Sequence, residues 1–221
     1  LDLLMQDCTA VADSSVNFPT YVGINMMFNA NLDCCAWGGG QFLTIDGTTK
    51  VYRVTWLPPW AQHYDVIGHE MGHGFDFPHS SGPLDSPPSY VYVSDWDVMS
   101  AAGGTCVVRS NSMCVAQGTI AYHLDIDGWI PSNKRSTIAY GTVCSVNLQS
   151  LSSTTVSTDS LVAIIPVGVS STHCYAVEAR ELTGYDQNVP GKAVVIHDVN
   201  TATRRETPAM VVDANDGNNN V

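Results

Sequence analysis

Four residues within eleven positions have the types and spacing needed to hold a metal ion and activate water. His69 and His73 are four positions apart, so on an α-helix both imidazoles lie on one face, about one turn apart. His79 follows, and a helix ending near Gly74 would bring it back as a third nitrogen ligand. Glu70 points to the side, where its carboxylate can bond a metal-held water. Three neutral histidines and one open position are typical of a catalytic zinc ion rather than a structural one.

A surface helix with unrelated histidines is the alternative interpretation, because His-Glu-x-x-His also occurs by chance. The third histidine at this spacing favours the metal site. A thermolysin-like zinc site would need a glutamate ligand on a following helix, and no Glu occurs between Glu70 and Glu178. A serine nucleophile is also poorly supported, because the chain contains no Gly-x-Ser-x-Gly motif.

Length, composition and net charge limit the classes of protein to which this chain can belong. The 221 residues, of which 44% are hydrophobic, suit a globular chain with one domain, or two subdomains about a cleft. No apolar run reaches the roughly 18 residues of a membrane span, so none is expected. Nine basic residues against 21 acidic ones give a net charge of −12. This negative charge repels the phosphates of nucleic acids, so no nucleic-acid partner is expected. We also expect the protein to be a monomer.

Seven cysteines indicate disulfides in an exported protein, because cytosolic chains rarely carry so many and no Cys-x-x-Cys pair is present. Proximity in the sequence predicts the pairs Cys106–Cys114, Cys144–Cys174, and Cys8 with either Cys34 or Cys35, with one thiol left over. The chain begins within folded-looking sequence, so we expect that a signal peptide has been removed and that the protein is secreted.

The elements that position the histidines are predicted from periodicity. Residues 1–13 carry apolar side chains at helical spacing and predict a helix that backs a sheet. Residues 21–28 are a short apolar run and predict a buried central strand. Residues 41–46 and 50–56, separated by an Asp-Gly turn, predict two more strands. The second is expected at an edge, either an ordinary one or one that pairs with an extended substrate.

Two local patterns add to this picture. The run Trp37-Gly38-Gly39-Gly40 predicts a backbone that bends sharply or approaches another segment closely. The histidine helix is predicted over about residues 61–74. Its apolar stripe is expected to face the core, opposite the histidines. The stripe consists of Tyr64, Ile67, Met71 and Phe75.

After His79 the chain becomes rich in Ser, Pro and Gly, which predicts loops, followed by a helix over 119–128 and short β-rich runs. The runs are 137–147, 161–167, 173–180 and 192–199. We therefore expect an α+β fold. Residues 1–79 would form an N-terminal subdomain with the sheet, the backing helix and the zinc-binding helix. Residues 80–221 would form an irregular, β-rich C-terminal subdomain, the two together making one catalytic domain.

The histidine motif followed by Met99, in Trp96-Asp97-Val98-Met99-Ser100, resembles the metzincin clan of zinc endopeptidases. The chain looks most similar to the secreted branch that includes immune-inhibitor-A-like and gametolysin-like peptidases. The matching segments lie between about residues 16 and 199. They are YVGINMMFN, WGGG, VIGHEMGH, FPHS, SDWDVMS, DGWIP, YAVEAREL and GYDQNVPG.

The resemblance implies a twisted mixed sheet with an active-site helix above a zinc cleft, and protein or peptide substrates. It implies that one Zn²⁺ is held by His69, His73 and His79, with Met99 as a structural floor beneath the metal. Glu70 would act as general base towards a zinc-bound water and later deliver the proton to the leaving amine.

Asp76 departs from the family pattern, which has glycine three residues after the second histidine so that the chain can turn sharply. Aspartate tolerates left-handed geometry at a cost of about 1 kcal/mol. Alternatively, Gly74 makes the turn earlier. Asp76 is also expected as a hydrogen-bond acceptor for a ligand imidazole. At position 79, immune-inhibitor-A-like members often carry Asp, so His79 follows the wider clan.

Other residues receive weaker assignments. Tyr90, Tyr92 and Tyr185 are candidates for a phenol that stabilises an oxyanion, with packed or surface tyrosines as the alternative. The segment 125–128 (Asp-Ile-Asp-Gly) suggests a Ca²⁺ loop but lacks the third oxygen ligand of an EF-hand, so a helix-ending turn is the favoured interpretation. Glu178 and Arg180 are expected to form a structural ion pair. The alternative function is a zinc-fold binding or adhesion module with weak or no turnover, motivated by Asp76 alone.

Overall fold

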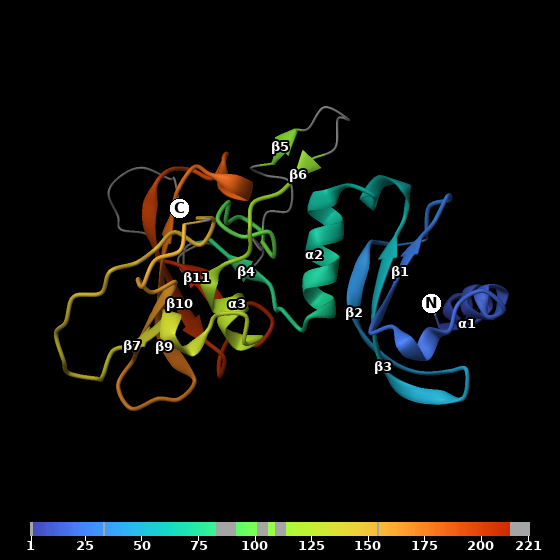
Figure 1. The fold of residues 1–221 in the computed structure, drawn as a ribbon, viewed down its shortest axis with the longest axis horizontal. Helices are drawn as coiled ribbons and strands as arrows, with labels where there is room; N and C mark the ends of the chain where they lie inside the picture. Colours follow the sequence, from blue (N-terminus) through green and yellow to red (C-terminus); the bar gives the residue numbers. More distant parts are fainter. Residues whose placement is uncertain are drawn as a thin grey trace. The chain divides into compact units, whose positions relative to one another are not determined.

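The computed structural model describes residues 2–32, 34–82, 92–100, 106–108, 114–153 and 155–212. Helices are few and short, and mixed sheets make up most of the regular structure, so the α+β class is confirmed (Figure 1). The chain forms two compact units, residues 1–62 with 70–76, and residues 63–69 with 77–221. The boundary expected after His79 stays a prediction.

The first unit is built on a three-stranded sheet in the order β1–β3–β2. Its strands are β1 (Gly23–Met27), β2 (Trp37–Ile45) and β3 (Thr48–Leu57). β1 runs parallel to β3, and β2 runs antiparallel to it. Asp46 and Gly47, both with positive φ, form the predicted tight turn between β2 and β3.

The strand order differs from the predicted one. The run expected to be central is the edge strand β1, and the run expected at an edge is the central strand β3. β3 takes the middle because it pairs on both sides and is long enough to bury Tyr52, Val54 and Trp56 completely. β2 begins at Trp37, so the glycine run lies in a strand and not in a loop.

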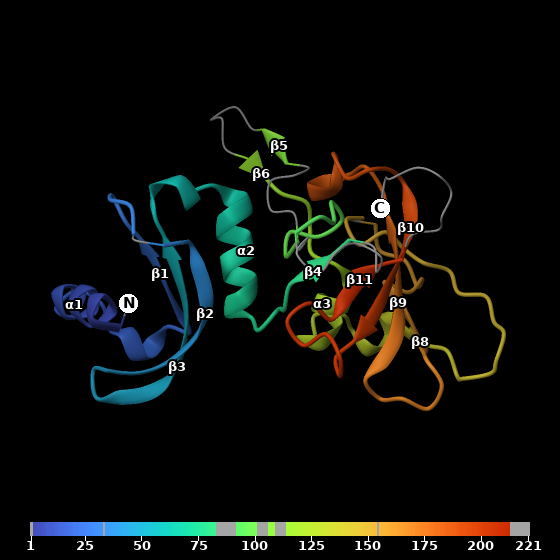
Figure 2. The same ribbon diagram turned by 180° about the vertical axis from the view of Figure 1, so that it is seen from behind.

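Helix α1 (Asp2–Ala12) covers one face of this sheet, as its apolar spacing predicts (Figures 1 and 2). The short helix η1 (Phe18–Thr20) follows it and packs into the same core. The buried cluster between helix and sheet is apolar and consists of Met5, Phe18, Met26, Tyr52, Val54 and Trp56. Burying side chains of this size stabilises by about 1.5–3 kcal/mol each, so apolar area holds this unit together.

Helix α2 (Tyr64–Gly74) follows the short helix η2 (Pro59–Ala61). Its second half packs on the sheet face opposite α1, against Gly38 of β2. A Cβ added at Gly38 would stand only 1.8 Å from the carbonyl oxygen of Glu70, so only glycine fits there. The close approach predicted from the glycine run is therefore confirmed.

The apolar stripe expected on α2 does not face the core. Tyr64 is 49% exposed, and Met71 and Phe75 are each 37% exposed. The buried side instead carries His69 and Glu70, each 8% exposed. The prediction was wrong because close backbone packing, made possible by glycine, takes the place of large apolar side chains on the buried side of this helix.

The second unit is built on a six-stranded sheet in the order β4–β11–β10–β9–β8–β7. Its strands are β4 (Ser80–Ser81), β7 (Arg135–Thr137), β8 (Val162–Pro166), β9 (His173–Arg180), β10 (Ala193–Asn200) and β11 (Ala209–Val211). The runs predicted at 161–167, 173–180 and 192–199 are therefore confirmed. The strand predicted at 137–147 is wrong beyond residue 137, because β7 ends at Thr137.

Shorter elements complete this unit. Helix α3 (Ala121–Ile126) lies within the helix predicted at 119–128 and packs on β8 and β9. An apolar cluster that includes Ile120, Val162 and Ala176 fills the space between them. The remaining elements are a hairpin of β5 (Val107–Val108) with β6 (Cys114–Val115), and the short helices η3 (Ser132–Lys134) and η4 (Gly184–Asp186).

Charged side chains lie at the centre of the second unit. The Arg180 guanidinium is fully buried and bonds Glu178 at 2.7 Å and Asp186 at 2.9 Å. It also donates to the carbonyl oxygens of Trp96 and Thr119, at 3.0 Å each. The predicted Glu178–Arg180 pair is thus confirmed and belongs to a larger buried group.

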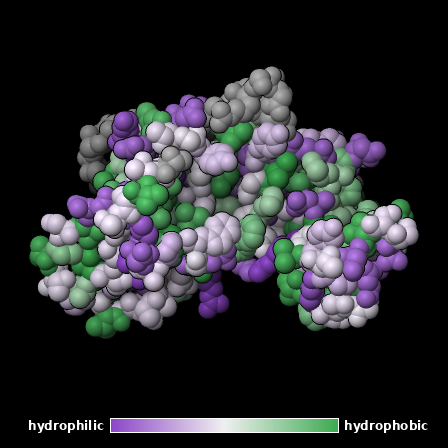
Figure 3. Space-filling view, viewed as in Figure 1, coloured by the Kyte–Doolittle hydropathy of each residue, from purple (hydrophilic) through white to green (hydrophobic). Residues whose placement is uncertain are grey.

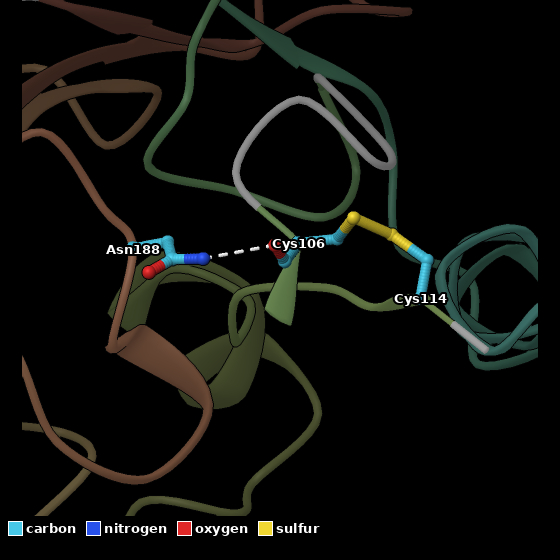
Figure 4. The surroundings of a disulfide bond; sticks show 3 residues. All are labelled: Cys106, Cys114 and Asn188. Atoms are coloured by element: carbon cyan, nitrogen blue, oxygen red, sulfur yellow. Dashed lines mark hydrogen bonds between the residues drawn. A yellow bond between two sulfur atoms is a disulfide. The ribbon is translucent and has the colours of Figure 1, made fainter. Parts of the chain in front are cut away.

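The structure contains one disulfide among the described cysteines, the predicted Cys106–Cys114 bond, beside which Asn188 donates to the Cys106 carbonyl at 2.9 Å (Figure 4). The predicted Cys144–Cys174 bond is wrong, because Cys174 packs against the α3 core while Cys144 is an exposed loop residue. Cys8 is not bonded to Cys34 or Cys35 either, because it packs against the α1 core.

Hydrophobic and hydrophilic residues are interspersed over the visible surface (Figure 3). No helix within the described ranges is long and apolar enough to cross a membrane.

Candidate metal centre

Helix α2 positions the first two histidines. His69 and His73 lie on it one turn apart, as the spacing predicts. The helix ends at Gly74, after which the Phe75 amide donates to the Gly72 carbonyl at 2.9 Å and the Asp76 amide donates to the His73 carbonyl at 3.0 Å. These bonds satisfy carbonyl groups of the last turn and direct the chain away from the helix axis.

Asp76 makes the turn between the second and third histidines. Its φ is +62°, whereas Gly74 is not among the described residues with positive φ, so the turn is not made at the glycine. The Asp76 carboxylate accepts from Arg53 Nη1 of β3 at 2.6 Å. The predicted bond between Asp76 and a ligand imidazole is therefore wrong. The partner of the carboxylate is an arginine, because the left-handed geometry at residue 76 brings the carboxylate within reach of β3.

The chain after the turn is fixed by a distant segment. The His79 amide donates to the Glu206 carbonyl at 3.1 Å. Ser80 and Ser81 then form β4, which pairs in parallel with β11. The third histidine is therefore anchored through the backbone rather than left on a free loop.

The three histidines come together as predicted. His69, His73 and His79 each offer one ring nitrogen, and these nitrogens all lie within 4.8 Å of one another. His69 is buried, and His73 and His79 are half-buried. Three imidazole nitrogens at this spacing fit a metal such as Zn²⁺, whose bonds to nitrogen are about 2.0–2.1 Å long.

A tight turn orients His69. The Asp97–Ser100 turn is closed by a 3.0 Å bond from the Ser100 amide to the Asp97 carbonyl. Within it, the Val98 carbonyl lies 2.7 Å from His69 Nδ1. A carbonyl can only accept, so Nδ1 carries the proton and Nε2 keeps its lone pair for a metal. Met99 follows and is completely buried. That it forms a floor beneath the metal stays a prediction.

Asp97 ties this turn to the third histidine. One oxygen of its buried carboxylate accepts from the Met99 amide at 3.1 Å, and the other accepts from the Ser80 hydroxyl at 2.6 Å. His123 Nδ1 lies 3.2 Å from the same carboxylate. Burial would raise the pKa of Asp97, but the His123 charge and the hydrogen bonds hold it well below its usual range. One carboxylate thus fixes the residues next to both His69 and His79.

Glu70 is the remaining group of the motif. Burial raises the pKa of its carboxyl to about 7. A carboxylate with this affinity can take a proton from water and release it again near neutral pH. Burial also lowers the pKa of His69, against the opposing effects of the Val98 carbonyl and the Asp97 charge, which keeps that imidazole neutral as a ligand must be.

Of the three predicted tyrosines, Tyr92 lies at the histidines. Its hydroxyl is 3.2 Å from His79 Nε2, and its ring stands edge-on to His79 with centroids 4.9 Å apart. Its φ is +68°, an uncommon conformation for a large side chain, which the ring contacts help to hold. Tyr185 is 63% exposed in η4 and makes no hydrogen bond or ring contact with the three histidines. Tyr90 lies outside the described residues.

Residues 125–128, considered as a calcium loop, instead make an ion pair and end a helix. Both carboxylate oxygens of Asp125 accept from Arg135 Nε at 2.9 Å. Asp127 caps α3, and Gly128 follows with a φ of +71°. The structure therefore supports the helix-ending turn.

The sequence did not assign a role to Asp97 or His123. Asp97 belongs to the segment around Met99, but its spacing in the sequence does not predict the burial of its carboxylate. That carboxylate lies between His123, 26 positions later, and Ser80, 17 positions earlier.

No known family model, curated protein or solved structure matches the chain.

Proposed function

We propose that the chain is a secreted, zinc-dependent endopeptidase of the metzincin type that hydrolyses protein or peptide substrates. The observation that carries the proposal is the convergence of His69, His73 and His79 beside the buried carboxyl of Glu70. The Cys106–Cys114 disulfide supports export, because disulfides persist in oxidising compartments.

A zinc ion held by the three histidines would act as a Lewis acid that polarises the scissile carbonyl and acidifies water. Glu70 takes a proton from the attacking water and delivers it to the leaving amine, for which a pKa of about 7 is suited. The Tyr92 hydroxyl donates a hydrogen bond to the oxyanion that develops on the substrate, from its position beside His79.

Strand β2 provides a surface for the substrate backbone. Among the described strands β2 pairs only with β3, so its other edge offers unpaired backbone groups. Gly38 of that strand touches the Glu70 backbone, so the strand lies close to the proposed general base. An extended peptide adding to β2 would lie with its carbonyl groups near Glu70. This transfers the substrate-pairing role predicted for the second strand of the hairpin to the first.

The binding-module alternative loses its motivation. It rested on Asp76 disturbing the turn to His79, but Asp76 adopts the left-handed conformation and His79 joins the other histidines.

The proposal is tested with casein and a quenched peptide library, measured before and after a chelator and after readdition of single metals. We expect hydrolysis that the chelator abolishes and zinc restores. Glu70→Gln should lower kcat by about 10²- to 10⁴-fold while leaving bound zinc, measured by elemental analysis, unchanged. His79→Ala should lose the zinc. His63→Ala is the matched control, because His63 is exposed just before α2 and should change neither quantity. A Glu70→Gln protein as active as the parent would overturn the mechanism.

A further inference from the structure

Two adjacent cysteines shortly before β2 have no assigned partner. Cys34 and Cys35 are both exposed, and the Cys35 thiol donates to Cys34 Sγ at a sulfur–sulfur distance of 2.7 Å. The other free cysteine of the same unit, Cys8, packs against the α1 core instead. The reaction partner that the fold presents to each thiol is therefore its neighbour.

A bond between adjacent cysteines differs physically from an ordinary disulfide. Consecutive Cα atoms are about 3.8 Å apart across a trans peptide, whereas disulfides usually join Cα atoms about 4.4–6.8 Å apart. The Cys106–Cys114 bond, at 5.4 Å, lies within that range. A bond between residues 34 and 35 is therefore strained as well as exposed. Strained, exposed disulfides are the easily reduced ones that act as switches rather than as structural links.

The location gives such a bond a consequence. Gly38, three residues after Cys35, is the residue whose missing side chain allows the Glu70 backbone to approach β2. The hydrogen bond to Cys34 raises the pKa of the Cys35 thiol, and the nearby Glu70 carboxylate adds to this effect. The cysteine pair and the general base therefore belong to one neighbourhood in the first unit.

We propose that Cys34 and Cys35 form a reversible vicinal disulfide, a redox modification site just before the strand whose Gly38 contacts the Glu70 backbone. Oxidation uses a low-molecular-weight disulfide such as oxidised glutathione. The Cys34 thiolate attacks one glutathione sulfur and releases one glutathione thiol. The Cys35 thiol then displaces the second glutathione and closes the ring, its proton passing to the departing thiolate. Two electrons move from the cysteine pair to the oxidant, and two glutathione thiols are the products.

The first test is a mass measurement that does not depend on catalysis. Cleavage before aspartates releases residues 33–45, which contain Cys34 and Cys35 and no other cysteine. Intact chain is equilibrated in glutathione buffers of increasing reducing power, blocked with an alkylating agent and digested. We expect an unalkylated peptide 2 Da lighter than the dithiol in oxidising buffer, and a doubly alkylated peptide in reducing buffer.

The strained bond should be reduced before the unstrained one. The 34–35 bond should open at a ratio of reduced to oxidised glutathione at least about tenfold lower than the ratio that opens Cys106–Cys114. A peptide that carries two glutathiones, or one cross-linked to the Cys8 peptide, would overturn the proposal. So would a 34–35 bond as resistant to reduction as Cys106–Cys114.

The second test asks whether the bond reaches the general base, and this part rests on the proposed function. Amide hydrogen exchange at residues 37–40 should be about threefold slower in the oxidised than in the reduced chain. Peptide hydrolysis should change between the two states in the parent and in Cys144→Ser, the control for an exposed free thiol. It should not change in the Cys34→Ser/Cys35→Ser double variant. Redox-independent exchange and hydrolysis in the parent would refute the link to Glu70, and a chain with no hydrolysis in either state would refute the proposed function while leaving the mass result intact.

Discussion

Both units have an apolar cluster, but they differ in whether charged side chains are buried beside it. In the first, the side chains between α1 and the sheet are almost all apolar, with Met5 and Trp56 among the most buried. In the second, the Arg180 guanidinium, the carboxylates of Glu178 and Asp186, and the Asp97–His123 pair are withdrawn from water together. The apolar core depends on area and volume, whereas the polar core depends on every charge keeping its partner.

This difference indicates what each core is for. An apolar core tolerates exchanges between side chains of similar volume. A buried charge network does not, because removing one member leaves another charge without compensation. The second unit, which contains the turn bonded to His69 and the strand after His79, has the less tolerant core. That core therefore holds the backbone around these two histidines as well as stabilising the unit.

The largest effect should come from breaking the polar core. Arg180→Met leaves two carboxylates buried without a cation, and we expect a loss of about 3–5 kcal/mol in the free energy of unfolding. Met5→Leu in the apolar core should cost less than about 1.5 kcal/mol. Urea unfolding gives both values, and hydrogen exchange in β9 and β3 assigns each loss to its unit. Arg135→Met is the control for an exposed pair and should cost about 1 kcal/mol or less. An Arg180→Met loss no larger than the Arg135→Met loss would remove the distinction between the cores.

A smaller effect is expected where the backbone of α2 meets β2. Gly38→Ala places a methyl group against the Glu70 carbonyl, and overpacking of this kind costs about 1–3 kcal/mol. Gly40→Ala is the matched control on the same face of β2, because its methyl group would meet only movable side-chain atoms of Val51 and Arg53. Thermal unfolding compares the two variants. Equal losses would mean that the close approach at Gly38 is not specific.

The polar core should also respond to acid. Burial lowers the pKa of His197, which interacts electrostatically with Glu178, Asp97, Arg180 and His123. Among the described residues, neither of its ring nitrogens has a hydrogen-bond partner. The folded state therefore binds fewer protons than the unfolded state below the unfolded pKa of 6.5, so the free energy of unfolding falls as pH drops below that value. The slope from this one group is at most about 1.4 kcal/mol per pH unit.

His197→Leu should reduce that slope, and at pH 8 it should be neutral or stabilise by about 1 kcal/mol, because it removes two unpaired buried nitrogens. Urea unfolding at a series of pH values measures both quantities. An unchanged slope between pH 7 and pH 5 would show that His197 does not contribute.

The smallest effect should come from the turn at Asp76. Asp76→Gly relieves the left-handed strain but loses the exposed bond to Arg53, so we expect a net change within about 0.5 kcal/mol. Asp76→Ala keeps the strain and loses the bond, at a cost of about 1 kcal/mol. Both variants should bind zinc as the parent does. Zinc loss in Asp76→Gly would show that the Arg53 bond, rather than the backbone conformation, delivers His79.

The residues of the metal site could be predicted because short-range spacing determines most of their geometry. Helical periodicity places His69 beside His73, and His79 follows His73 by only six positions. The sequence allowed the turn before His79 to be made at either Gly74 or Asp76. The positive φ of Asp76 shows that it is made there.

Strand order and burial could not be predicted in the same way. The sequence of β3 suits a central strand as well as an edge strand, and its place depends on pairing with β1, some 30 residues away. The buried side of α2 was mistaken because periodicity detects large apolar side chains and not close backbone contact through glycine. The Asp97 network joins residues whose separation along the chain carries no pattern.

The pairing of β4 with β11 has a consequence for how the protein is made. The backbone acceptor for His79 belongs to Glu206, 127 residues further along the chain, and β11 ends only at Val211. Contacts of such long range close late, because the loop between them must be ordered first. During synthesis the helix with His69 and His73 can form early, but the third histidine gains its anchor only when residues 206–211 have emerged from the ribosome. The backbone anchor of the third histidine is therefore acquired long after the helix that carries the other two has been made.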